Sequence, residues 1–145
     1  MPPILIEVGA GELADRTSIL SLKVLHLAGP ARGRAEAELA RLRVAAHAAG
    51  VHGPAVAPIV ADLAAVNAEL WDVEDAIREH EARGDFGPEF VALARSVYVL
   101  NDKRAALKRE IDLTLGGQSA EVKVYAVGFS RPGPCRRYPT AGTPR

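Results

Sequence analysis

The chain has 145 residues, 18 Lys or Arg against 18 Asp or Glu, and a single cysteine. This length suits one domain with a modest core, and the lone Cys135 excludes a disulfide framework or a thiolate metal cluster. Residues 1–115 carry 13 Lys or Arg against 17 Asp or Glu. A mildly acidic domain lacks the clustered basic face that binds phosphate backbones, so we do not expect a nucleic-acid partner. With no long apolar run and no signal-peptide pattern, we expect a soluble cytoplasmic protein without membrane insertion.

The first third of the chain predicts a short strand and two helices. The β-branched run Ile4–Val8 ends at a glycine, which is typical of a strand entering a turn. A helix is predicted over residues 12–27, where Asp15 and Lys23 lie off the apolar stripe and are expected to face solvent. Gly and Pro at positions 29 and 30 break the pattern, and a second helix is predicted over residues 35–49.

Two longer helices follow, over Ile59–Arg83 and Pro88–Leu115. Prolines fit the first turn of each helix, and Gly84 fits the left-handed residue just past the end of the first. Because the connection is so short, the two helices should be antiparallel neighbours. The apolar stripe of the first runs at alternating steps of four and three along Ile59, Leu63, Val66, Leu70, Val73 and Ile77.

The stripe of the second long helix becomes polar in its middle. In an antiparallel register Asn67 faces Arg104 and Glu74 faces Tyr98, so polar side chains converge between the helices. An unpaired charge there costs several kcal/mol, roughly, and Glu74 and Asp75 are the expected partners of Arg104 and Lys108. The residues of this candidate seam are Asn67, Trp71, Glu74, Asp75, Arg78, Tyr98, Asn101, Asp102, Arg104 and Lys108.

The seam has two main interpretations, a register-fixing network of salt bridges and a pocket for a small anionic ligand. In the second, Glu74 would act as acid or base and Trp71 or Tyr98 would form a wall. Simple solvent exposure on a two-helix arm is a further alternative. No residue can be assigned a catalytic role, and no cofactor is expected.

Metal chemistry is weakly indicated. The four histidines have no metal-ligand spacing, so no metal site is expected. Acidic residues on one predicted helix have the three- and four-residue steps of Mg²⁺-dependent helical nucleotide pyrophosphatases. A second acidic pair on another helix, which such enzymes need, is poorly matched. The acidic residues concerned are Glu69, Asp72, Asp75 and Glu79.

The predicted fold class is mainly α, an antiparallel bundle of about four helices with a long helical hairpin over residues 58–115. The alternating segment Glu121–Val127 predicts a strand that could pair with Ile4–Val8. Residues 1–127 would form the single domain. Residues 128–145, which are basic and proline-rich, would form a disordered tail.

Three blocks of the sequence resemble a family of small, uncharacterised bacterial proteins defined only as a domain of unknown function. The blocks are residues 11–20, residues 67–78, and residues 90–98 with 101–104 and 108–111, and the resemblance spans Ile4 to Tyr125. It implies no activity. It does imply an accessory role beside cell-surface polysaccharide biosynthesis.

The function expected from the sequence is a helical interaction or accessory module that forms a homo-oligomer or binds a protein partner. This follows from the sustained apolar spacing in at least three helices with alanine-rich faces. A small-molecule enzyme or binder holding an anionic ligand in the seam is the alternative, and the pyrophosphatase is a third.

Overall fold

The computed structural model is all-helical over the part of the chain that it describes, residues 2–116. Its four helices are α1 (Ala10–His26), α2 (Gly29–Ala48), α3 (Ala57–Arg83) and α4 (Pro88–Thr114). The predicted helical bundle is therefore confirmed. Within residues 2–116 there is no strand, so the predicted strand over Ile4–Val8 is wrong, and that segment is exposed and has no regular secondary structure. Its predicted partner Glu121–Val127 and the predicted tail lie outside the described residues.

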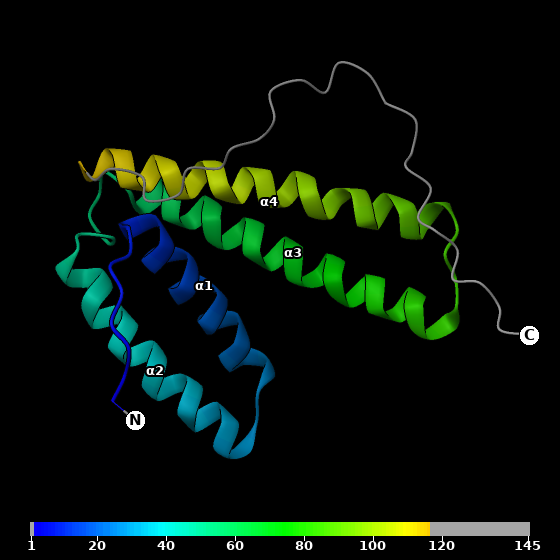
Figure 1. The fold of residues 1–145 in the computed structure, drawn as a ribbon, viewed down its shortest axis with the longest axis horizontal. Coiled ribbons are helices and arrows are strands. Elements are labelled where there is room, and N and C mark those ends of the chain that lie inside the picture. Colours follow the sequence, from blue (N-terminus) through cyan, green and yellow to red (C-terminus); the bar gives the residue numbers. More distant parts are fainter. Residues whose placement is uncertain (1, 117–145) are drawn as a thin grey trace, which may run out of the picture.

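The helices form two hairpins of unequal length. The long hairpin is α3 and α4, which lie side by side, and it extends well beyond the end of α1 (Figure 1). Helix α1 packs against both α3 and α4, whereas α2 contacts only α1 among the four described helices. No described helix is both long and apolar enough to cross a membrane.

Helix α2 begins six residues before its predicted start. Gly29, with φ of 58°, begins the helix, and Pro30 lies in the first turn. Proline is well suited to that position because its missing N–H has no partner there in any helix. The predicted break therefore shrinks to two residues, and Gly33 lies inside the helix. The predicted end of α3 is confirmed, since Gly84 is left-handed with φ of 65°.

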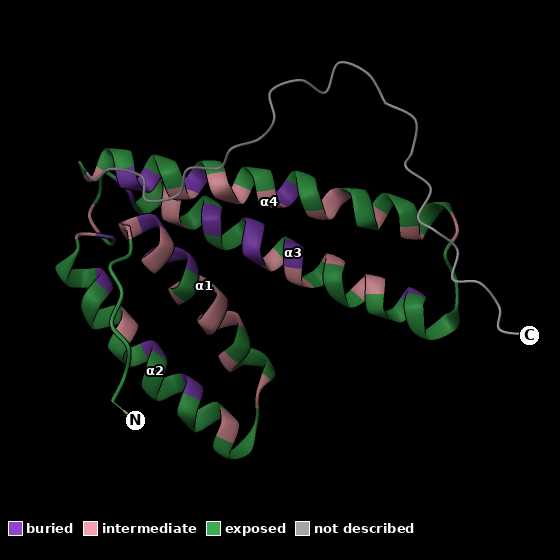
Figure 2. Cartoon of the chain, viewed as in Figure 1, coloured by how far each residue is buried: buried purple, intermediate pink, exposed green. Residues whose placement is uncertain are grey.

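Burial divides the long hairpin into two halves. The proximal half (residues 57–70 and 100–114) packs against α1 and contains most of the core residues, whereas the distal arm (residues 71–99), which contacts α1 through Trp71 at its start, extends past α1 (Figure 2). Within the described residues 71–99, His80 is the only buried one. The core cluster consists of Ala14, Ala46, Val51, Leu63, Val66, Leu70, Leu100, Leu107 and Ile111.

Helix α1 lies close against the backbone of α4 at Gly11. A Cβ atom placed on Gly11 would lie 2.1 Å from the carbonyl oxygen of Lys108, so only glycine fits. The Gly11 N–H donates a 2.7 Å hydrogen bond to Oδ1 of Asp112, which is buried on α4. Because Gly9 offers no side-chain cap, this carboxylate from another helix satisfies the first turn of α1 and complements its dipole. The contact fixes where α1 begins.

Candidate functional site

The centre of the polar seam is the carboxylate of Asp15, which is only 1% exposed. Arg104 donates to both of its oxygens, from Nε at 2.8 Å and from Nη2 at 2.5 Å. Asn67 donates from Nδ2 to the same Oδ1 at 2.9 Å. Three helices therefore meet at one buried charge, which is paired and hydrogen-bonded as a buried carboxylate must be.

A second ion pair continues the seam one turn closer to the N-terminus of α1. Lys108 donates to Oε2 of Glu12 at 2.7 Å, and Arg16 donates to Oε1 of Glu12 at 2.8 Å. The hydrogen bond from Lys108, and then that from Arg16, hold the pKa of Glu12 below its ordinary value. Glu12 is thus fixed in its charged form.

These contacts correct two predictions. The expected partners of Arg104 and Lys108 were Glu74 and Asp75, but the carboxylates that meet them are Asp15 and Glu12 of α1. Asp15 was also expected to face solvent. It is buried because α1 lies across α3 and α4, an arrangement that residue spacing within a single helix does not reveal.

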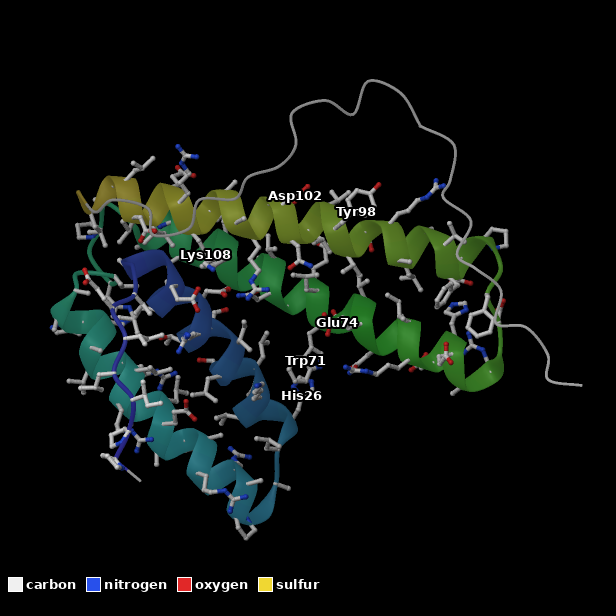
Figure 3. All side chains as sticks on the ribbon, viewed as in Figure 1. His26, Trp71, Glu74, Tyr98, Asp102 and Lys108 are labelled. Atoms are coloured by element: carbon white, nitrogen blue, oxygen red, sulfur yellow. The ribbon has the colours of Figure 1, made fainter. Side chains whose placement is uncertain are left out.

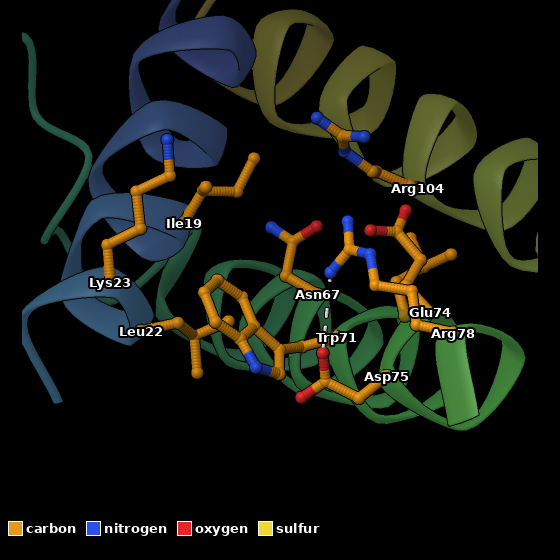
Figure 4. Close-up of a pocket in the computed structure, with 10 residues that line it drawn as sticks. Ile19, Leu22, Lys23, Asn67, Trp71, Glu74, Asp75, Arg78 and Arg104 are labelled. Atoms are coloured by element: carbon orange, nitrogen blue, oxygen red, sulfur yellow. Dashed lines mark hydrogen bonds and ion pairs between the residues drawn. The ribbon is translucent and has the colours of Figure 1, made fainter. Parts of the chain in front are cut away.

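Beside the network a groove opens between α1 and α3, and Arg104 of α4 also lines it (Figure 4). Its volume is about 300 Å³. The apolar part of the lining comes from Ile19 and Leu22 on α1 and from Leu70 and Trp71 on α3. The polar lining residues are Lys23, Asn67, Glu74, Asp75, Arg78 and Arg104.

Trp71 forms part of the outer wall of this groove. Its indole stacks on the His26 ring with centroids 4.5 Å apart and planes inclined by 23°, which joins α3 to the last turn of α1 (Figure 3). The Trp71 Nε1–H is shielded from solvent and has no acceptor among the described residues. An unsatisfied buried donor costs about 1–3 kcal/mol. The stacked position of the indole therefore carries this cost.

The ten residues of the predicted seam separate into three groups. The groove brings together six of them: Asn67, Trp71, Glu74, Asp75, Arg78 and Arg104. Lys108 and Asn101 belong to the network, where Asn101 Oδ1 accepts from Arg104 Nη1 at 3.3 Å. Tyr98, 60% exposed, and Asp102 lie on the exposed side of α4, with Tyr98 directed away from α3 (Figure 3).

Sequence reasoning missed the contribution of α1. Glu12 and Asp15 are three residues apart, Arg104 and Lys108 are four apart, and opposite charges at such steps on two helices are a pairing signal. With α1 antiparallel to α4, Glu12 meets Lys108 and Asp15 meets Arg104, as the hydrogen bonds show. The spacing alone did not indicate which helix would face α4.

No group of three or more His, Cys, Asp or Glu side chains within residues 2–116 is arranged to hold a metal ion. The acidic residues at positions 69, 72, 75 and 79 lie on the exposed surface of α3. The nucleotide pyrophosphatase alternative therefore gains no support from the geometry of the described part.

No protein-family model, curated protein or solved structure matches this chain. The resemblance to the domain of unknown function, and the accessory role that it implies, stay predictions.

Proposed function

We propose that this protein is a helical interaction module that self-associates through its distal arm. The carrying observation is that residues 71–99 include a single buried residue, His80. Apart from Trp71, which stacks on His26 of α1 at the start of the arm, α3 and α4 pack mainly on each other there, which covers one side of each helix and leaves the rest in water. A second pair of helices would cover the remainder.

The arm has apolar side chains suited to such a contact. On α4, Val91, Tyr98 and Val99 are exposed large residues, and Phe86 at the tip is 54% exposed. Val91 and Tyr98 are seven residues apart, which places them on one face of α4. Val73, Ile77, Phe90, Leu93 and Val97 are only half-buried.

The charges favour α4 over α3 as the contact surface. The exposed positions of α3 in the arm are mostly charged, whereas those of α4 are mainly apolar or small. Charged side chains are depleted at the centre of protein interfaces. Two arms meeting through α4 would form an isologous four-helix bundle.

The polar seam gives a second argument for this proposal. Its charges are engaged by partners within the chain, Asp15 with Arg104 and Glu12 with Lys108. Such a network fixes α1 on the proximal half, as polar groups at core positions can fix register. With α1 held there, it does not extend along the arm, and most of the arm is left without a covering helix.

The test is sedimentation equilibrium of the wild type and two matched variants, Val99→Asp in the arm and Val44→Asp on α2. The two valines are 56% and 73% exposed. We expect a dimer with a Kd on the order of 10 µM. Val99→Asp should weaken it by at least about tenfold, and Val44→Asp should leave it unchanged. A wild type that is monomeric at every concentration, or equal effects of both substitutions, would contradict the proposal.

A further inference from the structure

The groove between α1 and α3 carries an independent inference, because its unpaired charges are of both signs. Arg104 is neutralised by Asp15, and Arg78 lies 3.4 Å from Oδ1 of Asp75. Lys23 and Glu74 remain, and neither forms an ion pair or hydrogen bond with any residue from 2 to 116. A groove with one cation and one anion to offer does not suit the simple anion expected from the sequence.

A buried polar side chain also lines the groove. Asn67 is 4% exposed, and its Nδ2 donates to Asp15 at 2.9 Å and to Ser18 at 3.2 Å. Because a carboxylate accepts only from the N–H side of an amide, Asp15 fixes the orientation of the group. Oδ1 of Asn67 is therefore turned away from Asp15, and in Figure 4 it points to the side of the groove where Glu74 and Arg78 lie, with Lys23 on the opposite side.

The rest of the lining is apolar and of limited size. Ile19, Leu22, Leu70 and Trp71 provide an aliphatic and aromatic surface. The volume of about 300 Å³ lies at the lower end of ligand pockets, which span about 300–1,000 Å³. A ligand of roughly a dozen heavy atoms would fill it.

We propose that the groove binds a small zwitterion with an apolar body, the chemistry of a free α-amino acid with a large apolar side chain. Lys23 binds the carboxylate. Glu74 and Oδ1 of Asn67 accept from the ammonium group. The apolar body lies against Trp71 and Leu22. The proposal does not depend on self-association, since the groove belongs to one chain.

Trp71 makes the test direct, since it is the only tryptophan of the chain and lines the groove. Its fluorescence can be titrated with three probes that share a phenyl body and differ in charge. These are phenylalanine (zwitterion), 3-phenylpropionate (anion) and phenethylamine (cation). We expect saturable binding of phenylalanine with a Kd of about 1 mM, at least about tenfold tighter than either analogue.

Two variants at exposed positions separate the charges, and two controls match them. Lys23→Met should weaken the binding of phenylalanine about tenfold and leave the binding of phenethylamine unchanged. Glu74→Gln should do the same for phenylalanine and leave 3-phenylpropionate unchanged. Lys103→Met and Glu69→Gln, at exposed positions that do not line the groove, should bind like the wild type.

The outcomes decide the proposal in either direction. A zwitterion preference that both groove variants remove and both controls keep supports it. Tightest binding of 3-phenylpropionate would identify an anion site and overturn it. No saturable change with any probe up to about 30 mM, or equal effects of groove and control variants, would overturn it as well.

Discussion

The two halves of the long hairpin use the same two helices but differ in what stabilises them. In the proximal half, α1 covers the seam, and Leu63, Val66 and Ile111 are fully or almost fully buried. In the distal arm, apolar residues occur at similar spacing, yet Val73 and Val97 stay half-buried. The difference shows that an apolar stripe becomes a core only where a third helix covers it.

The largest effect is expected where α1 meets α4. Gly11→Ala places a Cβ atom 2.1 Å from the Lys108 carbonyl oxygen, so the two backbones must separate. The overpacking and the strained Gly11–Asp112 hydrogen bond should together cost about 4 kcal/mol. Urea denaturation measures the loss. The control is Gly33→Ala in α2, where nothing lies within 4 Å of the new Cβ and a gain of about 0.5–1 kcal/mol is expected. Equal behaviour of the two variants would contradict the close approach.

The ion pairs of the two regions should differ almost as much in what they contribute to the free energy of unfolding. Asp15→Asn leaves Arg104 without its buried carboxylate and should destabilise the fold by about 3 kcal/mol. Asp75→Asn removes an exposed partner of Arg78, with side chains 53% and 74% exposed, and should cost at most about 0.5 kcal/mol. The free energies of unfolding of both variants decide this. A mild effect of Asp15→Asn would mean that the network does not hold α1 in place.

The same substitution on the same helix should have unequal effects in the two regions. Leu107→Ala, at a buried position of the proximal half, should lower the free energy of unfolding by about 2.5 kcal/mol. Leu93→Ala, at a half-buried position of the arm, should lower the free energy of unfolding of the monomer by about 1 kcal/mol. Chemical denaturation at low protein concentration compares them. Equal losses would indicate that the arm is as well packed as the proximal half.

Acid should weaken mainly the contacts that stabilise the proximal half. The folded pKa of Glu12 is lowered, chiefly by Lys108, so its stabilising contribution is present above the ordinary carboxyl pKa of about 4.3. It is lost as the pH falls through the lowered folded pKa. The stability difference between wild type and Glu12→Gln should therefore be largest near neutral pH and shrink in acid, a small effect because Glu12 is partly exposed. A difference that is constant with pH would contradict the Glu12–Lys108 pairing.

The sequence predicted the long hairpin well because its periodicity, prolines and Gly84 are local signals. It also placed Asn67 and Arg104 together, and both now bond the same oxygen of Asp15. It did not predict how α1 crosses the hairpin, because crossing depends on contacts such as Gly11 against Lys108 that periodicity does not encode. The site consequently moved from the α3–α4 seam to the α1–α3 groove.

The central claim is that the arm lacks a partner that a second arm supplies, and hydrogen exchange at two protein concentrations tests it most directly. We predict that backbone amides of residues 72–99 exchange quickly in dilute protein and slow markedly at high concentration. Amides of residues 60–70 and 100–112 should be protected equally at both concentrations. Arm amides that are as protected in dilute protein as those of the proximal half would contradict the account, because the two-helix arm would then be stable by itself.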